Sequence, residues 1–179
     1  MDFRSVFLKQ KGINPDSIHR LEERVDRNGG KYMFYQLRVA RDQDTEALEA
    51  FLKKADTAHA EIDQQISRFI MLEDSEKKIA ACLGIEKFSG GKGLLRSLVM
   101  SDRLNQSHIV TLFQSMDVLC KKHEIQDVYL VANQPSSAEF LTVMGFETCA
   151  DVPDELYTSE HFRNSLCTEG SFLMVKTTA

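Results

Sequence analysis

The order of secondary structure between Leu98 and Phe146 restricts the fold of this chain more than any other feature. An apolar strand is followed by a polar loop, an amphipathic helix, a second apolar strand and a short helix that ends at Gly145-Phe146. This order places a helix N-terminus just past the end of a strand, where backbone amides and the helix dipole attract anions. The segment therefore predicts an α/β fold with a site for a phosphate-bearing cofactor.

The long helix of this segment has the clearest periodicity in the chain. It is expected from about Ser107 to His123, and its apolar residues recur at helical spacing on one face. These residues are Ile109, Leu112, Phe113, Met116, Leu119 and Cys120. The next strand, 127–132, is apolar enough to be buried. Ser136 and Glu139 then match a capping box at the start of the last helix of the segment.

The segments on either side predict more strands and helices of a single domain. Residues 32–40 alternate like a strand, and Asp42 or Asp44 can cap a helix whose apolar positions are Leu48, Phe51, Leu52 and Ala55. The next strands are expected at 68–72, 79–86 and 93–100, with turn residues between them, so they should form an antiparallel meander. The C-terminal part predicts a strand at 146–149, a helix or long loop at 155–166 and a closing strand at 172–176.

Residues 1–32 are predicted to be an extension, separate from a main domain over 33–179. Pro15-Asp16-Ser17 followed by Ile18, Leu21 and Val25 indicates a short amphipathic helix, ended by Asn28-Gly29-Gly30. Such an extension can either clip onto the main domain or bind a partner, and the clip is favoured.

Composition excludes several classes of protein. The 179 residues are 42% hydrophobic and 27% charged, as in a soluble globular domain, and the net charge of −5 argues against nucleic-acid binding. No apolar run reaches the ~20 residues of a membrane span, and the start of the chain lacks the apolar run of a secretory signal, so a cytoplasmic protein is expected. The four cysteines and five histidines are scattered, so we expect buried free thiols and no metal site.

The predicted order of elements, together with the Gly145-Phe146 ending, resembles the GNAT superfamily of acyl-CoA-dependent N-acyltransferases over residues 34–178. The resemblance implies a mixed, mostly antiparallel sheet flanked by helices, with acetyl-CoA as co-substrate and an amine as acceptor. It also implies that the fourth strand binds the pantetheine arm and that the following loop and helix N-terminus bind the pyrophosphate. The residues at these positions are Leu98, Val99, Met100, Leu104, Asn105, Gln106, Ser107, His108, Ile109 and Asn133.

The chain departs from the family pattern at several of these positions. Leu104 stands where the family has Arg or Gln, and Ser107 and Ile109 stand at its two glycine positions. Amide donors exist at any residue except proline, but glycine adds positive-φ geometry and room for a close approach. Arg103 can supply a positive charge there, partly offset by Asp102.

No catalytic residue is assigned from the sequence. The fourth strand has no acid over 94–98, and Leu141 stands where the family often has a tyrosine that protonates the leaving thiolate. Further candidates each have a simpler structural interpretation as a solvated, capping or core residue. They are Asp56, Glu61 and Asp63 for an amine, His108 for a phosphate, Glu160 and His161 as bases, Tyr157 as an acid and Cys149 as a nucleophile.

Two hypotheses follow. The first is an N-acetyltransferase of a small-molecule or peptide amine that works by direct attack in a ternary complex. The second is a catalytically degenerate GNAT-fold binding or regulatory module. Neither implies a nucleic acid or a membrane, and because the exposed edges of such sheets often pair, a homodimer stays open.

Overall fold

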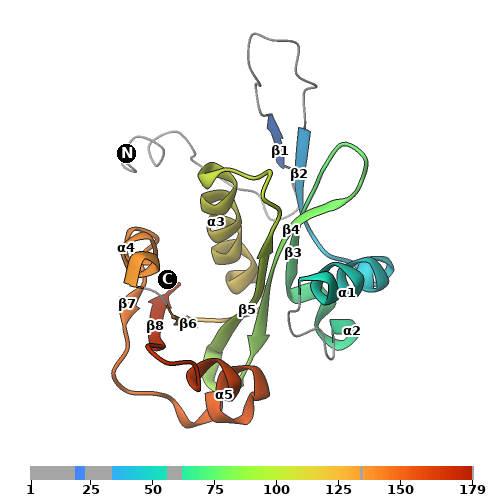
Figure 1. The fold of residues 1–179 in the computed structure, drawn as a ribbon. Coiled ribbons are helices and arrows are strands. Elements are labelled where there is room, and N and C mark those ends of the chain that lie inside the picture. Colours follow the sequence, from blue (N-terminus) through green and yellow to red (C-terminus); the bar gives the residue numbers. More distant parts are fainter. Residues whose placement is uncertain (1–18, 23–33, 56–61, 134, 179) are drawn as a thin grey trace. The chain divides into compact units, whose positions relative to one another are not determined.

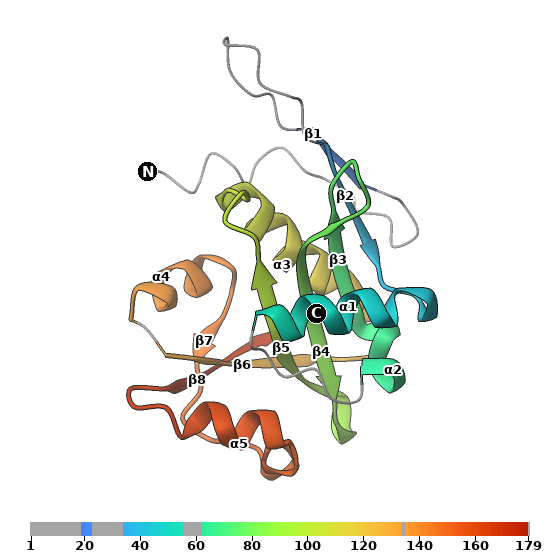
Figure 2. The ribbon, with the colours of Figure 1, turned by 45° about the vertical axis from the view of Figure 1, so that its right-hand side comes forward.

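The computed structural model describes residues 19–22, 34–55, 62–133 and 135–178 (Figures 1 and 2). The strands are β1 (His19–Glu22), β2 (Phe34–Val39), β3 (Phe69–Glu73), β4 (Ile79–Lys87), β5 (Lys92–Met100), β6 (Asp127–Ala132), β7 (Glu147–Thr148) and β8 (Phe172–Thr177). The helices are α1 (Thr45–Lys54), α2 (Ile62–Gln65), α3 (Gln106–Lys122), α4 (Pro135–Val143) and α5 (Glu160–Leu166). Four 3-10 turns join them: η3 (Asp42–Asp44), η4 (Ile66–Arg68), η5 (Ser89–Gly91) and η6 (Asp154–Thr158).

The strands follow the order β1-β2-β3-β4-β5-β6-β8-β7. Pairing is antiparallel between β1 and β2, β2 and β3, β3 and β4, β6 and β8, and β7 and β8, whereas β5 and β6 are parallel. This confirms the expected α/β class with a mixed, mostly antiparallel sheet. The described residues form two compact units, and β4, β5 and α3 each run from one unit into the other.

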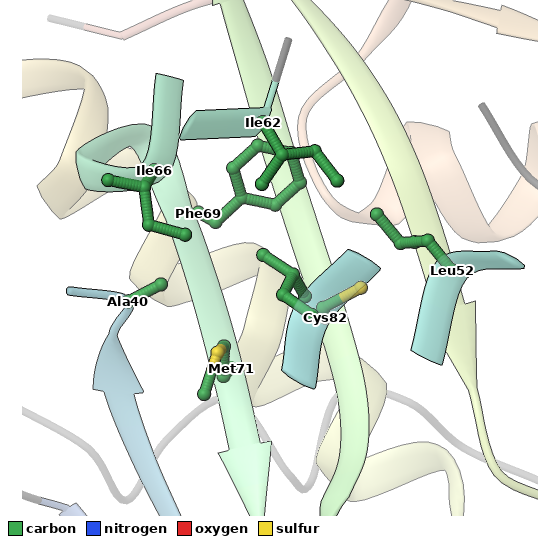
Figure 3. Close-up of a cluster of buried hydrophobic side chains, with 8 residues drawn as sticks. Ala40, Leu52, Ile62, Ile66, Phe69, Met71 and Cys82 are labelled. Carbon is green, nitrogen blue, oxygen red and sulfur yellow. The ribbon is translucent and has the colours of Figure 1, made fainter. Parts of the chain in front are cut away.

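The first unit, called here the α1 unit, contains the described residues of Asn14–Gly84 and Ser97–Met116. Its core forms because α1 and α2 place their apolar residues at helical spacing against the apolar residues of β3 and β4. Leu48, Leu52, Ile62, Ile66, Phe69, Met71, Cys82 and Ala40 are all buried there (Figure 3).

A charged network joins the N-terminal end of α1 to β2 and β3. The Arg38 guanidinium lies 2.6 Å from Asp44 Oδ2 and 2.5 Å from Glu73 Oε1, and all three side chains are largely buried. Asp44 Oδ2 also accepts the amide hydrogen of Arg41 at 2.7 Å. Asp44 is the N-cap of α1, as predicted, but its carboxylate binds these groups and accepts no hydrogen bond from the first turn of α1.

The second unit, called here the α5 unit, contains Ile85–Arg96 and Asp117 onward. Here β8 lies between β6 and β7. Side chains of η6 and α5 pack against side chains of β5, β6 and β8. Its core contains Leu94, Tyr129, Leu156, Phe162 and Leu173. Gly145 ends the α4 segment with φ of +90°, which confirms the predicted stop.

Most predicted elements are confirmed, including β2, α1, the β3–β4 hairpin, α3 and β6. The helix predicted around Ile18–Val25 is wrong where the structure describes it, because His19–Glu22 forms β1 and pairs with β2. Backbone pairing along the edge of β2 outweighs the weak helical pattern there. The rest of that predicted helix and its Asn28-Gly29-Gly30 ending lie outside the described residues.

Candidate functional site

Strand β5 changes its geometry halfway along. Its register with β6 comprises Lys92, Gly93 and Leu94, although β5 continues to Met100. Ser97 has φ of +55°, in the left-handed region that a non-glycine residue rarely adopts. This side chain is buried, and its carbonyl oxygen accepts a hydrogen bond from Cys82 Sγ at 3.3 Å. Ser97 is therefore a fixed irregularity of β5, of the kind that re-aims a strand next to a functional site.

A cavity of about 860 Å³ lies within the α1 unit beside the end of β5. Its walls come from α1, the β3–β4 turn and the segment Val99–Arg103, and Tyr35 of β2 also contributes. Apolar side chains line much of it, including Phe51 and Ile79. A cavity of this size can enclose a large part of a small molecule.

The lining of this cavity carries more positive than negative side chains. Its cationic residues are Lys54, Lys77, Lys78 and Arg103, and its acidic residues are Asp74 and Asp102. Lys78 Nζ lies 2.6 Å from Glu76, so part of its charge is compensated. Arg103 and its neighbour Asp102 both line the cavity, so the negative charge of Asp102 partly offsets the positive charge of Arg103. The excess of cations favours an anionic ligand.

The N-terminus of α3 is capped by its own side chains. Asn105 Oδ1 accepts the amide hydrogens of Ser107 at 3.0 Å and of His108 at 3.4 Å, and the hydroxyl of Ser107 at 2.5 Å. In return, His108 Nδ1 accepts the amide hydrogen of Asn105 at 3.1 Å. This is the reciprocal arrangement of a capping box, with histidine in the place of the usual glutamate. Amide hydrogens that were expected to meet a phosphate therefore meet Asn105.

The His108 side chain corrects two expectations. It is only 3% exposed, so it is not a surface residue of a cap, and its ring packs edge-on against Tyr35 with centroids 4.9 Å apart. An imidazole held between Tyr35 and the Asn105 amide does not point to a solvent-side phosphate. A contribution of His108 to an anion site is thereby limited to its backbone amide.

The other predicted cofactor residues are spread around β5 and α3. Val99 and Met100 line the cavity, whereas Leu98 is 40% exposed and is not part of the lining. Asn105, Gln106 and Ser107 are exposed, Leu104 and Ile109 are half-buried, and Asn133 is exposed just after β6. Leu141, at the position of the family tyrosine, is buried and carries no acid–base group.

A second polar cluster lies within the α5 unit. Phe88 donates its amide hydrogen to Lys92 O across the turn between β4 and β5. Counting two residues back along β4 and two residues forward along β5 from this pair places Glu86 opposite Leu94. Arg96 follows Leu94 by two residues, so it lies on the same face of the hairpin as Glu86. Leu94 itself packs in the core formed with η6 and α5, and this face therefore looks toward α5.

Helix α5 supplies the other members of this cluster. The hydroxyl of Ser159, the N-cap of α5, donates to Glu86 Oε2 at 2.8 Å and accepts the amide hydrogen of Phe162. His161, in the first turn, is half-buried, and this burial together with the charge of Arg96 lowers the pKa of its imidazole, while Glu86 raises it. His161 is therefore mostly neutral near pH 7 and able to accept a proton.

Glu86 and Arg96 were missed as candidates from the sequence. The family pattern predicts an acid within 94–98, whereas Glu86 lies on the preceding strand, β4, which pairs with β5. A signal for Arg96 was present, since a charged residue follows two leucines within a strand expected to be buried.

The remaining candidates have simpler environments. Tyr157 is 47% exposed and packs edge-on against Phe162, and Glu160 is exposed. Cys149 is half-buried against the core of the α5 unit, and its thiol donates to Asp151 O. Cys82 and Cys120 are buried, which raises the pKa of each thiol to about 12, but Cys167 is exposed, so the expectation that all four thiols are buried is wrong.

Two of the three acids predicted to bind an amine lie outside the described residues. Asp56 and Glu61 are outside the described residues, and Asp63 is exposed on α2. Within the part of the chain that the structure describes, no three His, Cys, Asp or Glu residues gather as metal ligands, and no helix is long and apolar enough to cross a bilayer.

Comparison of sequences finds a relative of high similarity. The chain is 64% identical over 144 residues to the uncharacterized protein YwlB of Bacillus subtilis (strain 168), a match that covers 80% of this chain and 98% of that protein. No model of a known protein family matches the chain.

Comparison of structures identifies the fold. N-acetylglutamate synthase from Neisseria gonorrhoeae, solved with coenzyme A and N-acetyl-glutamate, superposes with a TM-score of 0.62 at 18% identity over 82% of this chain, which spans only 35% of that protein. An acetyltransferase of the GNAT family from Staphylococcus aureus Mu50 superposes with a TM-score of 0.56 at 13% identity, covering 81% of this chain and 99% of that one. The chain therefore belongs to the family of YwlB and has the fold of the GNAT acetyltransferases.

Proposed function

We propose that this chain is an acyl-CoA-dependent N-acyltransferase, with acetyl-CoA as the donor and an amine as the acceptor. The observation that carries the proposal is the cation-rich cavity of about 860 Å³ beside Val99 and Met100. Coenzyme A combines phosphate groups with a long, weakly polar arm, and a partly apolar cavity with lysines and an arginine suits both parts. Solved structures of the same fold that hold coenzyme A give independent support.

In this proposal the arm of the cofactor follows Leu98, Val99 and Met100, where β5 has left its register with β6. The diphosphate binds at the first turn of α3, where Asn105 turns away and its place on the amides of Ser107 and His108 is taken by phosphate oxygens. Lys54 and Arg103 add positive charge. Leu104, Gln106, Ile109 and Asn133 complete the proposed contacts.

The reaction is a direct attack of the amine on the thioester. The attack needs an unprotonated amine, and a neutral imidazole can take up the proton that the amine loses; within the α5 unit, His161 has a lowered pKa and is such a group. Half-buried Glu86 and buried Arg96 lie on the hairpin face that looks toward α5 and set the electrostatic environment of this base.

One observation favours the second candidate function, a GNAT-fold binding or regulatory module. The amides at the start of α3 already have partners in Asn105 and His108, so a phosphate must compete with a cap that the chain itself provides. Such a module would bind its partner through the same cavity or through residues outside the described part.

A transfer assay separates these two functions. Purified protein is incubated with acetyl-CoA and pools of primary amines, while release of the coenzyme A thiol is followed with a thiol reagent and products are identified by mass. Amine-dependent thiol release with a product 42 Da heavier than its amine is expected, the acetyl increment. Thiol release that no amine accelerates, in the presence of bound acetyl-CoA, would favour the binding module.

A further inference from the structure

Arg96 is a buried cation that forms no ion pair within the described part of the chain. Its side chain is 6% exposed, and its Nε atom has no hydrogen-bond partner among the described residues. None of the ion pairs within that part includes it. A guanidinium keeps its proton at any physiological pH, so its burial without a counter-charge is costly. Such a cost is tolerated where a ligand brings the missing anion.

The groups around Arg96 narrow the chemistry of that ligand. Glu86 shares its face of the hairpin, and Arg96 and Glu86 both act electrostatically on the imidazole of His161. The cluster thus offers one positive group, one negative group and one neutral base. A phosphate would be repelled by Glu86, and a simple amine would leave Arg96 without an anion. A zwitterion satisfies both charges.

We propose that Arg96 and Glu86 form the acceptor subsite and that the acceptor is an α-amino acid, whose carboxylate binds Arg96 and whose ammonium group binds Glu86. This rests on the proposed acyltransferase function and names its substrate class. The planar fork of an arginine matches a carboxylate with two parallel hydrogen bonds, and the charge assistance strengthens both.

The chemical step balances with the groups at hand. His161 accepts one proton from the bound ammonium group and later releases it to solvent. The nitrogen lone pair then attacks the thioester carbonyl carbon, the amide C–N bond forms and the C–S bond breaks. The second proton of the nitrogen leaves with the sulfur as the coenzyme A thiol. The products are an N-acetyl amino acid, the thiol and one proton.

The test compares each L-amino acid with its primary amide and with the amine that lacks the carboxyl group. For the best acceptor, kcat/KM with the free acid is expected to exceed that with the amide by about 100-fold or more, since the amide leaves Arg96 unpaired. Arg96→Gln should lower kcat/KM for the acid by about 100-fold and change that for the amide by less than about threefold. Arg96→Lys should retain part of the preference.

Arg163→Gln is the matched control, because Arg163 is an exposed arginine of α5 and loses the same charge. Arg96→Gln should not lower the Tm of the ligand-free protein, since it removes an unpaired charge, whereas a merely structural arginine would lower it. Equal kcat/KM for acid and amide in the wild-type protein, or an equal loss for both in Arg96→Gln, would overturn the subsite while leaving the acyltransferase intact.

If no amine reacts, the proposed acyltransferase function is wrong. The subsite is then tested separately, by measuring whether L-amino acids bind to the protein. Calorimetric titration of the L-amino acids is then compared between wild type and Arg96→Gln. Binding weakened about tenfold or more by the substitution supports the carboxylate subsite. Binding that is unchanged, or that is absent from the wild-type protein, overturns it.

Discussion

Asn105 and His108 cap the first turn of α3 reciprocally: Asn105 Oδ1 accepts the amide hydrogen of His108, and His108 Nδ1 accepts that of Asn105. The Asn105 side chain is exposed, whereas His108 is packed against Tyr35. The Asn105 side of this cap is therefore accessible to a ligand, whereas the His108 side is buried. A ligand that replaces Asn105 at the amides would leave His108 in place.

Asn105→Asp separates the stability of the cap from the binding of an anion. Aspartate is as good an N-cap as asparagine, so the free energy of unfolding should change by less than about 0.5 kcal/mol. Its negative charge lies where the diphosphate is proposed to bind, so the affinity for acetyl-CoA should fall about tenfold in a calorimetric titration at low salt. Asn164→Asp, an exposed site on α5 with the same change, is the control. Equal affinity in both variants would argue against a phosphate at this turn.

Ser107→Pro tests the amide itself. The substitution removes the N–H that now donates to Asn105 Oδ1, at a position in the first turn where proline is tolerated better than farther along the helix. Ser107→Ala keeps that amide and loses only the hydroxyl, so it serves as the reference. Acetyl-CoA should bind about five- to tenfold more weakly to the proline variant than to the alanine variant. Indistinguishable dissociation constants would exclude the Ser107 amide as a ligand.

The sequence predicts the elements that depend on local interactions better than those that depend on contacts between distant segments of the chain. Helix α3, strand β6 and the stop at Gly145 were predictable because periodicity and glycine conformation are local. Strand β1 was not, since it depends on pairing with β2 across a stretch of chain that lies between them.

The same distinction applies to the candidate site. The strand–helix order predicts a cofactor site beside the end of β5, and the structure has a cavity there that Val99 and Met100 line, but their contact with a cofactor stays a prediction. Glu86 and Arg96 could not be linked from the sequence, because the β4–β5 pairing and the packing of α5 bring them into one environment with His161.

The pH dependence of transfer should report His161. Burial and Arg96 lower the pKa of this imidazole below its ordinary value of 6.5, and Glu86 raises it. If neutral His161 is the base, kcat/KM falls as the pH drops through this lowered pKa. Arg96→Gln should move the acidic limb to higher pH and Glu86→Gln should move it to lower pH, measured with an acceptor amide to avoid loss of binding. Glu160→Gln, at an exposed neighbour, is expected to leave the limb in place, and shifts of the opposite sign would contradict the assignment.

Removal of Arg38 should destabilise the fold strongly. Its guanidinium lies between the carboxylates of Asp44 and Glu73, and Arg38→Met would leave two buried negative groups without their cation. A loss of about 3 kcal/mol in the free energy of unfolding is expected from denaturant titration. Lys78→Met, which breaks the exposed pair with Glu76, should leave the free energy of unfolding almost unchanged, because solvent screens this pair.

The same network predicts a loss of stability in acid. Arg38 lowers the pKa of Asp44 below its ordinary value of 3.8, so the unfolded chain binds the proton first as the pH falls. The contribution of Asp44 is fully present above pH 3.8 and disappears as the pH drops through the lowered pKa of the folded state. Asp44→Asn should remove this part of the acid dependence; an unchanged acid profile would show that Asp44 contributes nothing to it.

Calorimetric titration of acetyl-CoA tests the central claim, that the cavity of the α1 unit is a cofactor site. The wild-type protein should bind with a Kd of about 1–50 µM, and Lys54→Gln, which changes a cation of the lining, should weaken binding about threefold or more. Lys53→Gln, the exposed neighbour that is absent from the lining, should leave the Kd unchanged. No detectable heat at about 1 mM acetyl-CoA, or equal losses in the two lysine variants, would contradict the account.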